Sequence, residues 1–325
     1  MSSPMIVTTV PFVSESKPPA PIRPLFNRRT LRSFVKDKAK QAVVGFGCGL
    51  NWLFGCRTGN GLGILMYHRV ADSVPGIDPP TWNITPARFR EQLVGLLDRG
   101  FQPWPLRRVI EYHNLGKELP PKVFVVTFDD GYESVYTNGW PVLRDLGIPA
   151  TVFLATAFVD SQKPFPFDDW SGAGSSLAPI ETWRPLSSVQ CHEMMDNGLI
   201  DLGAHTHTHQ DFGNRSQEFG TDLAMNVKEL TSSYKIPDPG FTFPYGCVSP
   251  ELMDAALKCS VTCALTTLGS SVNAFDSPFG WGRFDVEAWD TSSSLAAKLG
   301  GWYSWAPKVQ RRVAMLRRRL TSGQK

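Results

Sequence analysis

The sequence predicts an α/β fold built from parallel βαβ units. Short apolar runs alternate with segments of helical spacing, which is the order expected of βαβ units. Polar residues that can carry chemistry fall directly after several of these runs. In a (β/α) barrel the carboxyl ends of the strands meet at one rim, so there this placement would gather those residues into one site. The expected strands cover residues 63–67, 123–128, 150–154, 200–204, 241–243 and 262–266.

Each expected strand is a run of β-branched, aromatic or other apolar residues. Residues 123–128, Val-Phe-Val-Val-Thr-Phe, are the strongest example. Such runs are apolar at consecutive positions, so they predict strands buried on both faces, as in a parallel sheet.

Cap residues and helical spacing mark the expected helices. Thr85 is the expected N-cap of one helix, with Pro86 in its first turn, and Gly100 ends it. Its apolar residues recur at helical spacing and are Phe89, Leu93, Leu96 and Leu97. Further helices are expected over residues 30–54, 141–146, 187–197 and 250–258.

Charge is distributed unevenly along the chain. The net charge of +3 comprises +6 in residues 1–56, −10 in residues 57–300 and +7 in residues 301–325. The acidic body argues against nucleic acid as the main partner, and the basic ends favour an anionic membrane surface. With 42% hydrophobic residues, the body can bury one sizeable core.

Composition divides the chain into four segments. Residues 1–28 are rich in Pro and Ser and are expected to be a disordered leader. Residues 29–57 are expected to be a helical extension that is basic first and apolar later. Residues 58–300 form the α/β domain, and residues 301–325 a basic amphipathic tail. The tail pattern fits an in-plane helix on anionic lipid and, equally, a solvated helix docked on the acidic body.

The sequence also bears on cellular location. No secretory signal is recognised, because residues 1–12 lack a basic region before an apolar run. The most apolar stretch, residues 42–56, is shorter than the ~20 residues of a spanning helix, which leaves a re-entrant or in-plane segment open. The six cysteines indicate free thiols in a reducing compartment, because the body is too large to need disulfides. We therefore expect a protein that is cytoplasmic or peripheral on the inner membrane face.

Two adjacent carboxylates, Asp129 and Asp130, follow the strand at residues 123–128 and precede Gly131. One carboxylate can hold a divalent cation, while its neighbour accepts a proton from water at that cation. Asp-Asp-Gly is also ordinary turn or helix-cap chemistry, so this motif alone leaves both interpretations open.

The segment His205-Thr-His-Thr-His209 is a more specific signal. It holds three of the six histidines of the chain. Imidazole is a common ligand for transition metals, and residues four apart can point the same way. We place His205 and His209 in the metal set and expect His207 to point away.

Two further sites are weaker by themselves. His68 follows the first expected strand, where a proton donor would be useful, although lone histidines are more often structural. Phe243-Pro244-Tyr245-Gly246 follows another strand, and a free backbone N–H there could donate to an oxyanion. Taken alone, this second segment is equally well explained as a loop.

Together, and in this order, residues 127–131, 205–209 and 243–246 resemble the first three motifs of the polysaccharide deacetylases with a NodB homology domain, carbohydrate esterase family 4. The resemblance covers residues 60–285. Residues 64–70, Ile-Leu-Met-Tyr-His-Arg-Val, also resemble the exopolysaccharide branch with the poly-N-acetylglucosamine deacetylases. The resemblance implies a distorted (β/α)7 barrel for residues 58–300.

The family's roles carry over to matching positions. The resemblance implies that Asp130, His205 and His209 bind one divalent metal, usually zinc, with Co²⁺, Ni²⁺ or Mn²⁺ as alternatives. It implies Asp129 as the general base, and the backbone N–H of Tyr245 as an oxyanion donor beside Pro244.

The sequence departs from the family pattern at three places. Gln210 stands where Pro often follows the second metal histidine. Thr242 replaces an Arg that usually steadies the base, so another residue must orient Asp129, and Arg283 is our candidate. The late Leu-x-His motif that supplies the acid is absent, because no histidine follows His209. In the resembling branch a first-strand histidine takes this role, which makes His68 the preferred acid.

The expected function is removal of acetyl groups from an N-acetylated glycan. Trp183 is the aromatic residue we select to contact the sugar, with Trp82 and Trp170 as further candidates. The alternatives are another metal-dependent amidohydrolase, with His205 and His207 as its ligand pair, and a non-catalytic carbohydrate-binding relative. The sequence leaves the choice between N- and O-deacetylation open.

Overall fold

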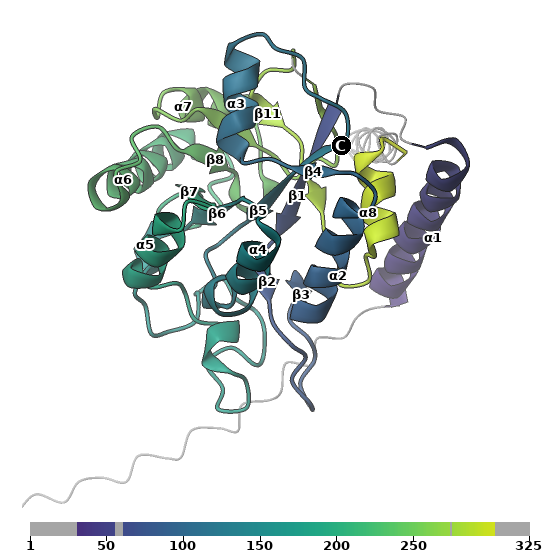
Figure 1. Cartoon of the computed structure of the whole chain (residues 1–325). Coiled ribbons are helices and arrows are strands. Elements are labelled where there is room, and N and C mark those ends of the chain that lie inside the picture. Colours follow the sequence, from purple (N-terminus) through teal and green to yellow (C-terminus); the bar gives the residue numbers. More distant parts are fainter. Residues whose placement is uncertain (1–30, 56–60, 274, 303–325) are drawn as a thin grey trace, which may run out of the picture.

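The computed structural model describes residues 31–55, 61–273 and 275–302. The expected leader and nearly all of the expected basic tail lie outside these residues, and the four segment boundaries stay predictions. The described body is built around one large curved sheet, with helices around its outside (Figure 1).

Parallel strands form an almost closed barrel, which confirms the predicted fold class. Its strands, in spatial order from one edge to the other, are β1 (Gly61–Tyr67), β5 (Val123–Phe128), β6 (Ala150–Leu154), β7 (Ile200–Ala204), β8 (Gly240–Thr242), β9 (Cys263–Leu265) and β11 (Phe279–Trp281). β12 (Phe284–Asp285) follows β11 and pairs in parallel with β1, while β11 pairs in parallel with β9. The short segment from β11 to β12 therefore contacts both edges of the sheet.

Shorter strands lie beside the barrel strands or form a separate pair. They are β2 (Arg69–Val70) paired with β3 (Asn83–Ile84), β4 (Gln102–Pro103) beside β5, and β10 (Val272–Asn273), which is antiparallel to β1. The sequence analysis did not predict them, because two residues are too few to show a periodic pattern.

The helices are α1 (Leu31–Phe54), α2 (Pro86–Leu97), α3 (Leu106–Asn114), α4 (Trp140–Leu146), α5 (Ser188–Asp196), α6 (Ser216–Tyr234), α7 (Pro250–Leu257) and α8 (Ser292–Leu299). The hydroxyl of Thr85 caps α2 by accepting a hydrogen bond from Arg88 N at 3.3 Å, as predicted. The sequence analysis gave no range for α3, and it missed α6 and α8. The N-cap of α6, Arg215, makes no side-chain cap bond, and α8 begins with three serines, which favour turns as readily as helices.

Side chains of the strands alternate between two apolar clusters. Leu62 and Ile64 of β1 point into the barrel, together with residues of β5, β6 and β9, and α3 covers this cluster at the amino ends of the strands (Figure 1). Leu65 and Tyr67 point outward against the helices. Because every second side chain of a strand points inward, this alternation also decides which residues reach the interior at the carboxyl ends of the strands.

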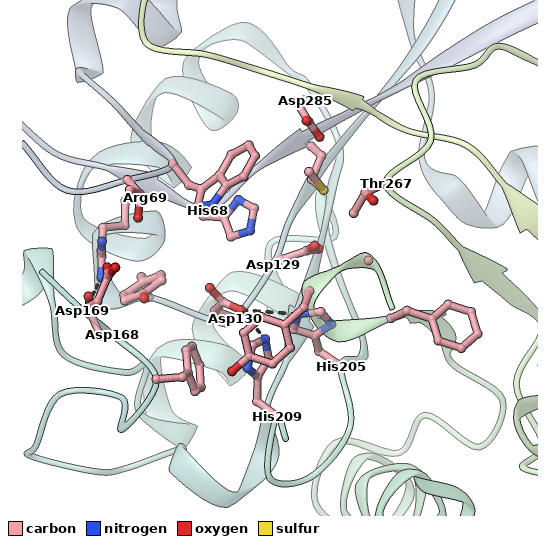
Figure 2. Close-up of a pocket in the computed structure, with 18 residues that line it drawn as sticks. His68, Arg69, Asp129, Asp130, Asp168, Asp169, His205, His209, Thr267 and Asp285 are labelled. Atoms are coloured by element: carbon pink, nitrogen blue, oxygen red, sulfur yellow. Dashed lines mark hydrogen bonds and ion pairs between the residues drawn. The ribbon is translucent and has the colours of Figure 1, made fainter. Parts of the chain in front are cut away.

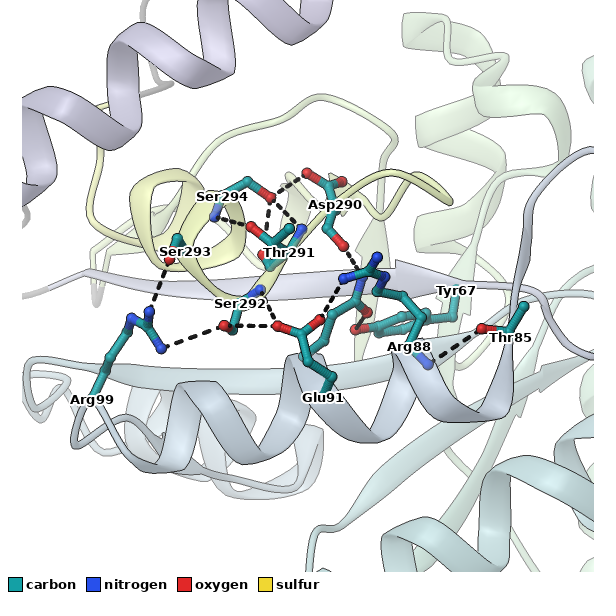
Figure 3. Close-up of polar contacts among 11 residues, drawn as sticks. Tyr67, Thr85, Arg88, Glu91, Arg99, Asp290, Thr291, Ser292, Ser293 and Ser294 are labelled. Carbon is teal, nitrogen blue, oxygen red and sulfur yellow. Dashed lines mark hydrogen bonds and ion pairs between the residues drawn. The ribbon is translucent and has the colours of Figure 1, made fainter.

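Helices α2 and α8 are joined by a network of polar contacts (Figure 3). Glu91 accepts hydrogen bonds from the backbone N and the hydroxyl of Ser292, at 3.3 and 3.0 Å, and Arg99 donates to Ser293 at 2.8 Å. The two helices lie so close at Gly95 that an added Cβ would come within 2.3 Å of Ser292. Because α2 follows β1 in the chain and α8 follows β12, this packing holds the C-terminal part of the described body against its N-terminal part.

Two further expectations concern membranes and thiols. No helix in the described ranges combines the length and the apolar character needed to cross a bilayer. The described cysteines, Cys48, Cys191, Cys247, Cys259 and Cys263, are all free thiols, as predicted. Cys56 lies outside the described residues.

Candidate metal and catalytic site

A pocket of about 400 Å³ opens at the carboxyl ends of the barrel strands (Figure 2). Predicted site residues from several strands line it, as the barrel argument required. They are His68, Asp129, Asp130, His205, His209 and Tyr245.

The alternation of side chains explains why these residues meet. Ile64 of β1 points into the barrel, so Met66 and then His68 continue on the same side. By the same parity Val125 of β5 leads to Thr127 and Asp129. The interior positions thus change from apolar to polar where the strands end.

Asp130, His205 and His209 form a compact set of potential ligands. The Oδ1 atom of Asp130 lies 3.3 Å from Nε2 of His205 and 3.2 Å from Nε2 of His209. The three potential ligand atoms lie within 4.8 Å of one another, and all three residues are buried. Burial disfavours ionisation of Asp130, but the two histidines outweigh it and hold the pKa of that carboxyl well below its ordinary value.

The backbone around this set is held in unusual conformations. Asp130 and His209 have φ values of 72° and 52°, and Gly131 has 89°. Such values are costly for residues with a Cβ, and in proteins they cluster at functional sites. Gly131 suits the turn, since an added Cβ would come within 2.7 Å of the Leu154 side chain.

Thr242 fixes the ring of His205. Nδ1 of His205 lies 2.9 Å from the carbonyl oxygen of Thr242 and 2.6 Å from its hydroxyl. With its proton on Nδ1 toward that carbonyl, the ring presents the lone pair of Nε2 to Asp130 and to any bound cation. The sequence analysis had noted Thr242 only as a departure from the family pattern.

Helix α6, which the sequence analysis missed, holds the histidine segment in place. Asp222 accepts hydrogen bonds from the backbone N of His207 at 2.6 Å and of Thr208 at 3.0 Å. Asn226 accepts one from His205 N at 3.0 Å. Both residues are buried, and their spacing of four places them on the same face of α6. Polar residues on the apolar face of a helix are the signal that could have found them.

Asp129 is oriented by Arg283, which was the sequence-based candidate. The two nitrogens Nη1 and Nη2 of Arg283 donate to the two carboxylate oxygens of Asp129, each at 2.6 Å. Arg283 lies between β11 and β12, and both side chains are buried. Burial raises the pKa of Asp129, but the guanidinium and His205 outweigh this effect, so the pKa is lowered. The carboxylate is therefore held ionised, as a general base must be.

His68 lies across the pocket from the three clustered potential ligands, and its ring stacks on Trp82 at 5.3 Å. Burial lowers the pKa of His68, while Asp130 and Asp129 act in the opposite direction. Nδ1 of His68 is buried, and no described residue makes a hydrogen bond to it.

Of the residues predicted to contact the substrate, some line the pocket and others do not. Tyr245 lines the pocket with φ of 57°, directly after the buried Pro244. Trp183 is not among the described pocket-lining residues, because its ring is buried in a separate apolar cluster with Trp170 and Ala178. Trp82, which is 45% exposed, is the tryptophan at the pocket.

His207 points away from the cluster, as predicted. Its Nδ1 lies 3.0 Å from the hydroxyl of Thr156. The amidohydrolase alternative, which used His205 and His207 as a ligand pair, therefore has no support in this geometry.

The donor set fits a divalent transition metal. One carboxylate and two imidazoles are ligands that Zn²⁺ and its neighbours accept, and three protein ligands leave a position open. Oδ1 of Asp130 and Nδ1 of His209 are buried, and within the described ranges neither has a hydrogen-bond partner of acceptable geometry. A cation would satisfy the first of these atoms.

The chain is similar in sequence to known polysaccharide deacetylases. Residues 116–264 match the model of the polysaccharide deacetylase family. The poly-β-1,6-N-acetyl-D-glucosamine N-deacetylase of Escherichia coli is 33% identical over 171 residues, which are 52% of this chain and 24% of that protein. The protein of the same name from Staphylococcus epidermidis is 25% identical over 221 residues, 62% of this chain and 71% of that one.

Solved structures show the same fold. The structure of IcaB from Ammonifex degensii has a TM-score of 0.63 and 26% identity, over 75% of this chain and 98% of that chain. A deacetylase from Streptococcus pyogenes in complex with acetate has a TM-score of 0.62 at 20% identity, over 74% of this chain and 99% of that chain. This chain spans about a quarter of the length of the Escherichia coli relative. Residues 116–264 therefore match the polysaccharide deacetylase family, and the chain is similar to the poly-N-acetylglucosamine deacetylases.

Proposed function

We propose that this protein is a metal-dependent deacetylase that hydrolyses N-acetyl groups of a glucosamine-type polysaccharide. The observation that carries the proposal is the pairing of two differently held carboxylates. Asp129 is held ionised by Arg283, and the adjacent Asp130 belongs to a cluster of three potential metal ligands. A base beside a metal site is the arrangement that hydrolysis of an unreactive amide requires.

The residues supply the remaining steps of amide hydrolysis. A divalent metal held by Asp130, His205 and His209 would polarise the acetyl carbonyl and lower the pKa of water. Asp129 takes a proton from the attacking water, whose oxygen bonds to the carbonyl carbon. The backbone N–H of Tyr245 donates to the oxyanion that develops. The C–N bond then breaks, acetate leaves, and His68 provides the proton for the sugar amine.

The substrate is proposed from the names of the relatives and from the pocket rim. Both relatives described above are named for poly-β-1,6-N-acetyl-D-glucosamine. Trp82 is half-exposed beside His68 and offers a flat face on which a sugar ring can stack. We propose N-deacetylation because an amine leaving group needs a proton donor, and His68 lines the pocket where it can serve as that donor.

Acetate release from a panel of acetylated glycans tests the proposal. The panel contains oligomers of β-1,6-N-acetylglucosamine, oligomers of β-1,4-N-acetylglucosamine and an O-acetylated glycan. We expect zinc-dependent acetate release from the first. If acetate were released from the O-acetylated glycan alone, the proposed reaction would be O-deacetylation instead of N-deacetylation. Binding of glycan without any release, in a protein that holds metal, would favour the non-catalytic alternative.

His68→Ala should lower turnover of the β-1,6-linked oligomer by about 10²-fold or more, because general acid catalysis is worth about 10²–10⁴-fold. Zinc content should stay unchanged, because His68 is not one of the clustered ligands. The measurements are kcat from acetate release and zinc per chain.

Two other histidines provide matched controls for this change. The ring of His113 packs edge-on against Trp281, and the ring of His192 lies against Tyr234 at an angle of 37° between the ring planes. Neither histidine is among the described residues that line the pocket. His113→Ala and His192→Ala should retain wild-type turnover. A loss of turnover in one of these variants but not in His68→Ala would assign the acid elsewhere.

We also propose that the protein is peripheral on an anionic membrane. The outer face of α1 supports this, since Phe46, Trp52, Leu53 and Phe54 are 64%, 84%, 62% and 70% exposed. No charged residue occurs between Lys40 and Arg57 in the sequence, whereas residues 303–325 carry seven basic residues and no acid. An apolar helix face and a basic segment are the two signals that stable attachment usually requires.

Co-sedimentation with liposomes tests this location. We expect binding to vesicles with anionic lipid but not to neutral vesicles, and weaker binding in salt, since each basic residue contributes ~1 kcal/mol near the surface. Truncation after Ala306 and the double variant Trp52→Ala/Leu53→Ala should each reduce binding. Phe275→Ala, at a residue 79% exposed elsewhere, is the control. Absence of binding to anionic vesicles at low salt would contradict a membrane role.

A further inference from the structure

The two clustered histidines are held by different kinds of contact. The ring of His205 is fixed by Thr242 through Nδ1. Nδ1 of His209 is also buried, but no described residue makes a hydrogen bond to it. Metal-binding histidines usually donate that second N–H to a partner, which sets the orientation of the ring. Among the described residues, the contacts that hold the Nδ1 side of the His209 ring are therefore not hydrogen bonds.

Aromatic rings take this role at His209. Phe167 stacks on the imidazole with a centroid distance of 3.8 Å and an angle of 27° between the ring planes. Tyr245 packs edge-on at 4.7 Å and 62°. A flat stack restricts rotation of the imidazole about its Cβ–Cγ bond, because turning the ring would bring its edge into the neighbouring face. The contact with Phe167 thus replaces the missing hydrogen bond as an orienting contact.

Phe167 is itself held by a buried ion pair. The next residue, Asp168, pairs with Arg69, and the two side chains are only 2% and 3% exposed. Asp168 also accepts a hydrogen bond from Trp170 N at 3.1 Å, and the Arg69 guanidinium lies 4.0 Å from the centre of the Tyr132 ring. Figure 2 shows this pair on the wall of the pocket beside the metal cluster. The pair fixes the loop from which Phe167 reaches His209.

Such an ion pair is poorly explained as a source of stability. Taking both charges out of water costs several kcal/mol, so a buried pair is often no better than apolar residues of the same size. What the pair does provide is a fixed geometry between two segments. Arg69 follows the proposed acid, His68, and Asp168 follows Phe167, so one contact joins the two sides of the pocket.

We propose that Phe167, anchored by the Arg69–Asp168 ion pair, is a positioning residue that fixes His209 for metal binding. This inference rests on the proposed metal-dependent function. It assigns no contact between Phe167 and the metal: the effect passes through the orientation of the His209 ring. Removing the aromatic face should therefore weaken metal binding without removing any ligand.

Zinc affinity, measured by competition with a chromogenic chelator, tests the proposal. We expect Phe167→Ala to bind zinc about 10–100-fold more weakly than the wild type, which is the usual effect of losing an orienting contact at a metal ligand. Phe167→Tyr keeps the flat ring and should restore wild-type affinity. Phe167→Leu fills the space without a flat face and should resemble Phe167→Ala. Leu177→Ala, at a residue 71% exposed on the same connection between β6 and α5, should bind zinc normally.

The ion pair is tested by a double-mutant cycle in the same assay. Asp168→Asn should also weaken zinc binding, and its effect should largely disappear in the Phe167→Ala background, because both changes act through His209. Thermal unfolding of the metal-free proteins monitors folding, and Phe167→Leu replaces Phe167→Ala if the latter does not fold. Zinc binding of wild-type strength in Phe167→Leu overturns the inference and leaves the proposed function intact. Absence of zinc binding in the wild type overturns both.

Discussion

Asp130→Ala, His205→Ala and His209→Ala should each abolish bound metal and reduce acetate release by about 10³-fold or more, since a catalytic metal contributes several kcal/mol of transition-state stabilisation. The expected effect is large because all three residues are buried and their ligand atoms converge within 4.8 Å. Two remaining ligands cannot fill the lost position, and the third histidine among the described pocket-lining residues, His68, is not part of this group. Zinc per chain and kcat are the two measurements.

His207→Ala is the matched control for these variants. His207 lies within the same histidine segment, but its ring contacts Thr156 rather than the three potential metal ligands. It should keep both metal and activity. The assignment of the site would be wrong if the purified wild type held no divalent metal and if added Zn²⁺, Co²⁺, Ni²⁺ or Mn²⁺ never produced activity.

Asp129→Asn should retain zinc but lose turnover by about 10²–10⁴-fold, the usual contribution of a general base. Asparagine has nearly the same shape, so the pocket keeps its form, but the amide cannot accept the proton of the attacking water. KM should change little compared with kcat. Zinc content and thermal unfolding separate this loss from a general disruption of the site.

Asp169→Asn is the control for this second change. Asp169 is another carboxylate that lines the pocket, but it is not paired with Arg283. Its amide variant should retain turnover within a few-fold. Turnover near the wild-type level in Asp129→Asn would show that Asp129 has a structural role only, and the base would have to be sought elsewhere.

The sequence determined the strands of the barrel, except β11, and the order of the chemistry along the chain. The strands at residues 123–128, 150–154 and 200–204 were predicted with the bounds that the structure has, because continuous apolar runs are a local signal. The placement of Asp129, His205 and His68 just after strand ends also followed from the sequence. A parallel barrel brings such positions together whatever the connecting helices are.

The selection of an aromatic residue for the sugar shows where local reasoning stops. Trp82, Trp170 and Trp183 are equivalent candidates in the sequence, since nothing in the neighbouring residues distinguishes a buried indole from one at a pocket. The structure buries Trp183 with Trp170 and leaves Trp82 at the pocket rim. Burial depends on contacts with distant segments, which no short pattern contains.

Only the tertiary structure decided how the site residues are held. Arg283 reaches Asp129 across 154 positions in the sequence, because the segment from β11 to β12 closes the barrel next to β1. Asp222 and Asn226 reach the histidine segment from α6, whose N-cap makes no side-chain cap bond, and Phe167 reaches His209 from a loop. Ligands were visible in the sequence because their chemistry is tied to residue type and strand position. Their supporting contacts were not, because a hydrogen bond, an ion pair or a ring stack requires only proximity in space, which the closure of the barrel provides.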